Sequence, residues 1–67
     1  MTKEEYTGVL DAQLALSRLG SLMRLISEST DDGNLVDSID LCADYAKASA
    51  ERLDQIPGFR EAKLRRD

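Results

Sequence analysis

The residues of this chain that could do chemistry are few. The 67 residues include no histidine, so nucleophilic catalysis with a histidine base is excluded. The one cysteine, Cys42, lies in a stripe of apolar residues, where a thiol stays protonated and unreactive, and we expect it in the core. Since no cluster of Cys and His has the spacing of a zinc site, the sequence predicts no structural metal.

Two groups of carboxylates also have the composition of a functional site. Asp31, Asp32 and Asn34 surround Gly33 as at the start of a calcium-binding loop, but the twelfth position, which requires glutamate, falls at or beside Cys42. We therefore interpret residues 30–34 as a turn and helix cap. A second group lies along one helical face, where nothing separates the pKa values of neighbouring carboxylates for acid–base catalysis. The prediction is a protein that is not an enzyme and has no cofactor.

The second group leaves two interpretations open. A solvated face that maintains solubility explains it, and so does a docking surface for a basic groove on a partner protein. The group consists of Asp37, Asp40, Asp44, Glu51 and Asp54.

The elements that must position these residues are helices. Residues 3–29 repeat apolar residues at helical spacing and begin with Thr2 and Glu5, which form a capping box. The turn formers at 30–34 separate this segment from a second periodic segment, 35–56. Because the connection between them is so short, the second helix must run antiparallel to the first. We expect an all-α fold over residues 1–67, a single helical-hairpin domain.

The ends of the second segment are less sharply defined. Asn34 is one candidate cap, and Asp31 or Asp32 would begin the helix earlier. Pro57 and Gly58 end the segment, and the tail 57–67 is short and basic. Pro57 can also open a short third helix, with Phe59 folding back onto the end of the hairpin.

The two helices differ in their faces. On 35–56 one apolar stripe faces away from the carboxylates, and on 3–29 a main stripe is expected to meet it, while Leu10, Leu14 and Leu25 point elsewhere. The stripe of the first helix comprises Val9, Ala12, Leu16, Leu19, Met23 and Ile26, flanked by Ala15 and Leu22. The stripe of the second comprises Leu35, Ile39, Cys42, Ala46, Ser49, Leu53 and Ile56, flanked by Val36, Ala43 and Ala50.

A lone hairpin cannot cover both sides of the first helix. With one cysteine and no metal ligands, such a small chain has oligomerisation as its remaining source of stability. We therefore predict a homodimer in which two hairpins form a four-helix bundle. The candidate residues for the dimer or partner interface are Tyr6, Leu10, Leu14, Arg18, Leu25 and Tyr45.

The predicted function is regulation, by inhibition, of a partner protein that the homodimer binds. The single cysteine fits a reducing compartment, no apolar run approaches the roughly 18 residues of a membrane span, and the start is not typical of a secretory signal, so we expect a cytoplasmic protein without membrane contact.

A hairpin that opens with Met1, Thr2, Lys3 and Glu5 resembles the Rop family of plasmid repressor-of-primer proteins. Those proteins are dimeric four-helix bundles that bind paired RNA loops through a polar and basic face, which Lys3 fits. The resemblance implies an alternative function, binding of RNA or DNA. The candidate contacts for nucleic acid are Lys3, Arg24, Arg60, Lys63, Arg65 and Arg66.

Overall fold

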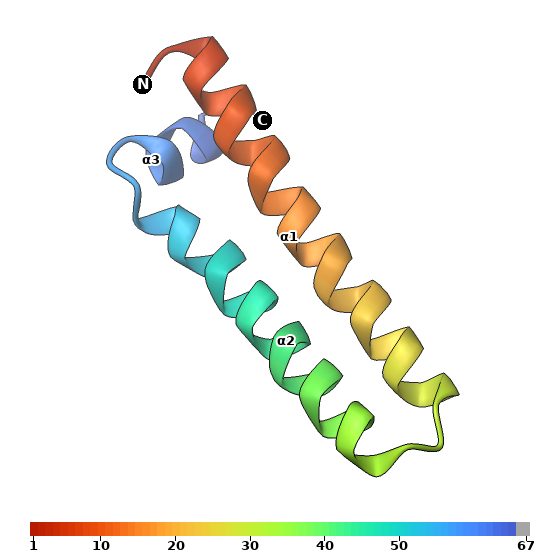
Figure 1. Ribbon diagram of the computed structural model, residues 1–67. Coiled ribbons are helices and arrows are strands. Elements are labelled where there is room, and N and C mark those ends of the chain that lie inside the picture. The colour runs from red at the N-terminus through yellow and green to blue at the C-terminus, as the bar shows by residue number, and fades with distance from the viewer. Residues whose placement is uncertain (66–67) are drawn as a thin grey trace.

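The computed structural model describes residues 1–65 and consists of two long antiparallel helices followed by a short third (Figure 1). Helix α1 spans Lys3–Ser29 and helix α2 spans Gly33–Arg52. A single 3-10 turn, η1, continues α2 over Leu53–Gln55, and α3 spans Phe59–Leu64. The all-helical prediction is confirmed for these residues, none of which lies in a strand. Within them no helix has both the length and the apolarity that crossing a membrane requires.

Helix α1 begins where the capping box predicts. Thr2 Oγ1 accepts a hydrogen bond from the Glu5 amide at 3.1 Å, and Glu5 Oε1 accepts one from the Thr2 amide at 2.8 Å. The hydrogen bond from the Thr2 amide, followed by the interaction with the Thr2 side chain, favours the charged form of the Glu5 carboxylate and lowers its pKa. The helix then runs uninterrupted to Ser29, the predicted end.

Helix α2 begins two residues earlier and ends earlier than the range 35–56 predicted. Asp32 is the cap, because its Oδ1 accepts from the amides of Asn34 and Leu35 at 3.0 and 3.2 Å. At the other end Ile56 has extended backbone, with ψ of 127°, as expected for a residue that precedes proline. The carboxylates of the turn therefore include a helix cap, as interpreted from the sequence.

The third helix folds back onto the start of α1. Gly58 makes the bend with a φ of 85°, a left-handed conformation that glycine adopts without strain. Phe59 then lies fully buried against Tyr6, with ring centroids 5.6 Å apart. The predicted return of Phe59 onto the end of the hairpin is confirmed.

Small residues line the contact between α1 and α2. Gly20 of α1 and Ala43, Ala46 and Ala50 of α2 are buried there. A Cβ atom on Gly20 would lie 2.9 Å from Lys47 Cγ and 3.2 Å from the Ala43 carbonyl oxygen, so the two helices approach more closely than larger side chains permit.

This contact corrects the sequence prediction of which faces meet. The stripe of α1 expected to face α2 is only partly covered: Val9, Leu16 and Met23 are half-buried, but Leu19 is 45% exposed and Ile26 55%. Leu10, expected to point away, is half-buried. The reason is that glycine and alanine allow a closer backbone approach than leucine and isoleucine, so the contact forms on the side of α1 that carries Gly20.

Cys42 requires a related correction. We expected it in the core with Leu35, yet Cys42 is exposed and Leu35 is 50% exposed. Ala43 and Ala46 occupy the buried position instead. The predicted stripe of α2 is therefore only partly buried, along the edge that carries its alanines.

Candidate protein-interaction site

One long face of the hairpin carries an apolar groove. It has a volume of about 490 Å³ and runs between α1 and α2. None of the lining residues is charged, and a site for a small polar ligand would need several converging polar groups. We call it the apolar groove; it is lined by Leu16, Leu19, Met23, Leu41, Cys42, Tyr45 and Ala46.

The α2 side of the groove has a row of small side chains next to α1. Cys42 and Ala46 are four residues apart and form one row along α2, next to the buried contact with α1. Leu41 and Tyr45 form the adjacent row farther from α1, and they are 72% and 69% exposed. The groove is thus a trough with a floor of Cys42 and Ala46 between two taller walls.

The apolar surface continues toward the turn. Leu22 and Ile26 follow Leu19 and Met23 at helical spacing and are 57% and 55% exposed. Leu35, seven residues before Cys42, extends the α2 side in the same direction. A contiguous exposed apolar surface makes this face the candidate interaction site.

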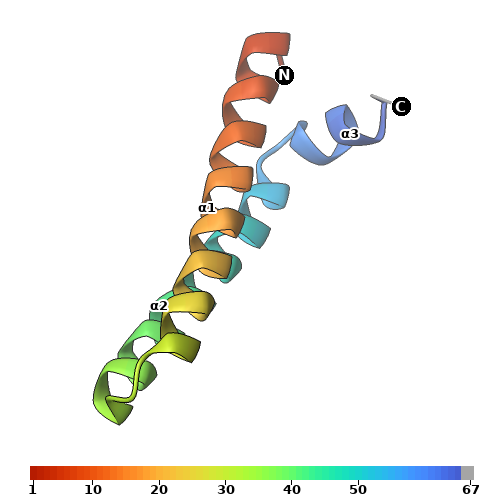
Figure 2. The same ribbon diagram turned by 90° about the vertical axis from the view of Figure 1, so that its right-hand side faces the viewer.

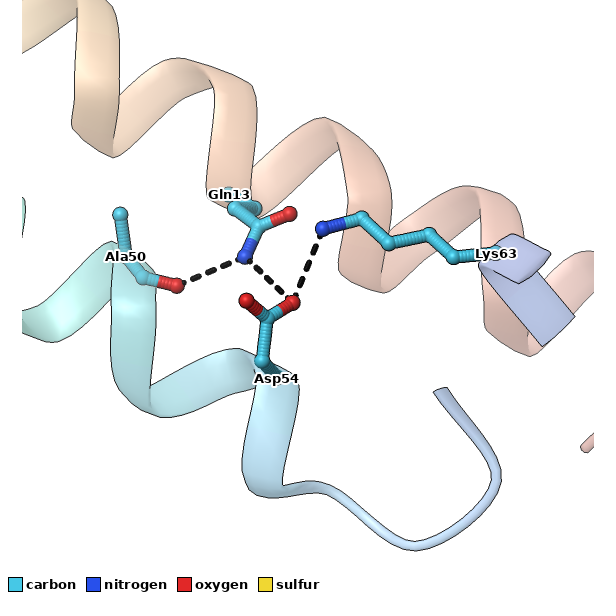
Figure 3. A network of polar contacts seen from close by, with 4 residues as sticks. All are labelled: Gln13, Ala50, Asp54 and Lys63. Atoms are coloured by element: carbon cyan, nitrogen blue, oxygen red, sulfur yellow. Dashed lines mark hydrogen bonds and ion pairs between the residues drawn. The ribbon is translucent and has the colours of Figure 1, made fainter. Parts of the chain in front are cut away.

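The other long face is polar, and its groups bond within the chain. Gln13 Nε2 donates to the Ala50 carbonyl at 2.8 Å and to Asp54 Oδ1 at 3.0 Å, and Lys63 Nζ reaches the same oxygen at 2.9 Å (Figure 3). The hydrogen bond from Lys63, followed by that from Gln13, stabilises the carboxylate and lowers the pKa of Asp54. The network ties α3 to both long helices.

Two further contacts follow the polar face toward the turn. Lys47 Nζ donates to Ser21 Oγ at 3.2 Å, and Arg24 forms an ion pair with Asp44. Figure 2 shows α3 turned out of the plane of the two long helices. Because Lys63 bonds Asp54, α3 lies toward the polar face and leaves the apolar groove uncovered.

The predicted interface residues do not gather in one place. Tyr45 lies in the apolar groove, whereas Tyr6 is buried against Phe59 within the chain. Leu14 borders the polar face beside Lys47, and it is 43% exposed. Arg18 and Leu25 are exposed, four and eleven residues after Leu14, so these three form a stripe along α1 that we call the outer edge. Leu10 is half-buried.

The predicted nucleic-acid contacts are spread along the molecule. Arg24 and Lys63 are engaged by Asp44 and Asp54. Lys3 is in the first turn of α1, about 31 Å along that helix from Arg24. Arg60 and Arg65 are exposed at the α3 end, and Arg66 lies outside the described residues.

Sequence reasoning placed most of the groove residues in the core of the hairpin. A signal for the true contact was present, because Tyr6, Gln13, Gly20 and Ser27 recur every seven residues and are all buried or half-buried. Their mixed polarity hid the row from a search for apolar stripes. A stripe of apolar residues therefore does not have to face the other helix of its own chain.

Among residues 1–65 no three His, Cys, Asp or Glu side chains lie close enough together to hold a metal ion. The arrangement offers a surface for binding and no grouping of reactive side chains. Comparisons with models of known protein families, with curated proteins and with solved structures find no match for this chain.

Proposed function

We propose that this chain is a non-catalytic interaction protein that works as a homodimer and regulates a partner protein by binding and inhibiting it. In the homodimer two hairpins meet through their apolar grooves and form a four-helix bundle. The observation that carries the proposal is the apolar groove itself, an uncharged trough on one long face, opposite a polar face already bonded within the chain.

The small core of a single hairpin supports the proposal. The buried apolar residues among those described are two aromatic residues and three alanines, Tyr6, Phe59, Ala43, Ala46 and Ala50. A chain of this size needs a further source of stability beyond so small a core, and its one cysteine provides no disulfide within the chain. Covering the groove with a second copy supplies the missing burial.

The exposed area gives the same indication. A folded monomer of 7.4 kDa is expected to expose about 4,200 Å². This chain exposes 5084 Å², an excess of about 900 Å² over that expectation. A stable interface removes about 800 Å² from each partner. One dimer interface on the apolar face would therefore bring the exposed area to the value expected of a compact protein.

A second copy suits the groove better than a charged partner does. The chain carries a net charge of −4, but none of it lies on the residues that line the groove. Two identical grooves therefore meet without like charges in contact, as an isologous interface requires. The acidic residues of the chain remain in solvent.

The outer edge of α1 is the candidate surface for the partner protein. Arg18 and Leu25 are exposed there, on a stripe that includes none of the groove residues. An arginine beside exposed leucines has the composition of protein–protein interfaces. Protein is favoured over nucleic acid because Arg24 and Lys63 are already held in ion pairs.

Denaturant unfolding at several protein concentrations tests the homodimer. If folding is coupled to dimerisation, the midpoint rises with protein concentration by mass action. A midpoint that is independent of concentration from about 1 to 100 µM contradicts the proposal.

The partner surface is tested separately with Leu25→Glu. The variant should keep the concentration-dependent unfolding midpoint of the wild type. It should not capture the partners that the wild type captures from a lysate, and in solution it should not compete with the wild type for them. If Leu25→Glu captures the same partners with the same affinity, the outer edge is not the partner surface.

A further inference from the structure

We infer that the second copy lies with its α1 over the trough of α2, so that the twofold axis runs parallel to the long axis of the hairpin. This inference rests on the proposed homodimer and specifies how its two copies are oriented. Each α1 would contact α2 of the other copy, and both turns would lie at the same end of the bundle.

The shape of the apolar face carries the inference. Its α1 side bears long side chains, Leu16, Leu19 and Met23. Its α2 side bears a row of short ones, Cys42 and Ala46, with the exposed Leu41 and Tyr45 as the outer wall. Well-packed helices place large side chains against small ones, so that facing layers interdigitate. The leucine-bearing side of one copy therefore fits the trough of the other, and symmetry makes the fit reciprocal.

The levels of these residues along the hairpin agree with this orientation. Gly20 is level with residues 43–47 and Gln13 with residues 50–54, as their contacts show. The long and short side chains of the groove thus lie at the same height. A twofold axis parallel to the helices leaves heights unchanged, so it places Leu19 and Met23 directly over Cys42 and Ala46 of the second copy.

The competing orientation has its twofold axis perpendicular to the helices. It stacks α1 on α1 and α2 on α2, which sets leucine against leucine on one side of the bundle. On the other side the exposed Leu41 and Tyr45 of one copy meet those of the other, so long side chains are set against long ones on both sides of the bundle. Overpacking of this kind destabilises a core.

The inferred orientation brings like charges together at the turns. Asp31 and Asp32 of both copies would lie at one end, where they are exposed. Repulsion between exposed charges is weak and is screened within about 8 Å at physiological ionic strength. The packing of the groove therefore outweighs it, and added salt should strengthen the dimer slightly.

Distances between spin labels distinguish the two orientations. The label is placed at Asp31→Cys, in the exposed turn, with Cys42→Ala removing the native thiol. The inferred orientation predicts a label separation of about 20–30 Å, because facing helices lie 8–10 Å apart and the labels add their own length. The competing orientation places the turns on opposite sides of the groove, whose α2 residues lie 10–15 residues, or about 15–22 Å, from residue 31, so it separates the turns by about 30–45 Å along the bundle and the labels by more than about 30 Å.

A matched label at Glu51→Cys, exposed near the middle of the hairpin, serves as the control. Its separation stays below about 40 Å in either orientation, because mid-level sites remain close across a bundle. A dimer with a long distance at residue 31 overturns the orientation and leaves the homodimer intact. A monomeric mass with no coupling at either site overturns the homodimer as well.

Discussion

The two long faces of the hairpin are built from the same two helices, and they differ in what completes them. On the polar face Gln13, Asp54 and Lys63 bond one another, and Arg24 pairs with Asp44. On the apolar face Leu19, Leu41 and Tyr45 remain largely exposed around a trough. The polar face therefore finds its partners inside the chain, whereas we propose that the apolar face finds them in another molecule.

The small residues at the contact between α1 and α2 determine which larger side chains remain exposed. Gly20 and the alanines of α2 form the contact between the two helices, although both helices also carry larger apolar side chains. Those larger side chains therefore remain exposed on one face. The energy that a monomer would have gained by burying them is reserved, in our proposal, for the second copy.

Two identical substitutions on α1 test the difference between the two faces, and we expect them to have the largest effect. Leu14 and Leu19 are 43% and 45% exposed, but they lie toward the polar face and in the apolar groove respectively. Leu19→Glu should weaken the dimer at least about 100-fold, because it buries an unpaired carboxylate in the interface. Leu14→Glu should leave the dimer intact. Sedimentation velocity measures both dissociation constants.

If the protein works as a monomer, the two variants should behave alike, since their exposed fractions in a single chain are nearly equal. Equal effects of Leu14→Glu and Leu19→Glu would therefore remove the distinction between the faces.

A pair of glycine substitutions tests the close contact of the helices. Gly8→Ala meets no atom within 4 Å and should stabilise the protein by about 0.5–1 kcal/mol through helix propensity. Gly20→Ala places its Cβ against Lys47 Cγ and the Ala43 carbonyl oxygen, so it should be less stable than Gly8→Ala by about 2 kcal/mol. Chemical denaturation measures both. Equal gains from the two variants would show that the contact at Gly20 is loose.

The thiol of Cys42 reports whether the groove is covered. It is exposed in a single chain, and a second copy over the groove would shield it. We expect its reaction with an aromatic disulfide reagent to slow about tenfold or more between dilute and concentrated protein, because only dissociated chains react. In Leu19→Glu the second-order rate constant should not depend on protein concentration, and the same independence in the wild type would contradict the covered groove.

The smallest effect is expected on the polar face, from its response to acid. The pKa of Asp54 is lowered by Lys63 and Gln13, so its contacts stabilise the fold above the unfolded pKa of about 3.9. That contribution is lost as the pH falls through the lower pKa of the folded state. The NMR ring signals of Phe59 should therefore shift toward unfolded values at acidic pH. In Asp54→Asn the Phe59 ring signals should already be shifted part of the way toward unfolded values at neutral pH. If the signals of the wild type and of the variant depend on pH in the same way, the network does not hold α3.

The sequence predicted the helices well because their limits depend on nearby residues. Thr2 and Glu5 define the start of α1, and Pro57 ends the second helical segment through its own ring. It predicted the faces poorly because a face depends on residues far along the chain. The contact of Gly20 with Ala43 is decided by how closely two backbones can approach, and a pattern of hydrophobicity does not record that distance.

The candidate site shows the same division. Tyr45, a candidate interface residue, lines the apolar groove, whereas Leu19 and Cys42 were assigned to the core because apolar stripes are usually buried within their own chain. Tyr6, also a candidate interface residue, is buried within its own chain, because Phe59 returns from 53 residues along the chain to cover it.

Sedimentation equilibrium of the wild-type protein at micromolar concentration shows whether a second copy completes the apolar groove. We expect a folded species of twice 7.4 kDa that dissociates only on dilution. A stable, folded species of 7.4 kDa at all accessible concentrations would contradict it.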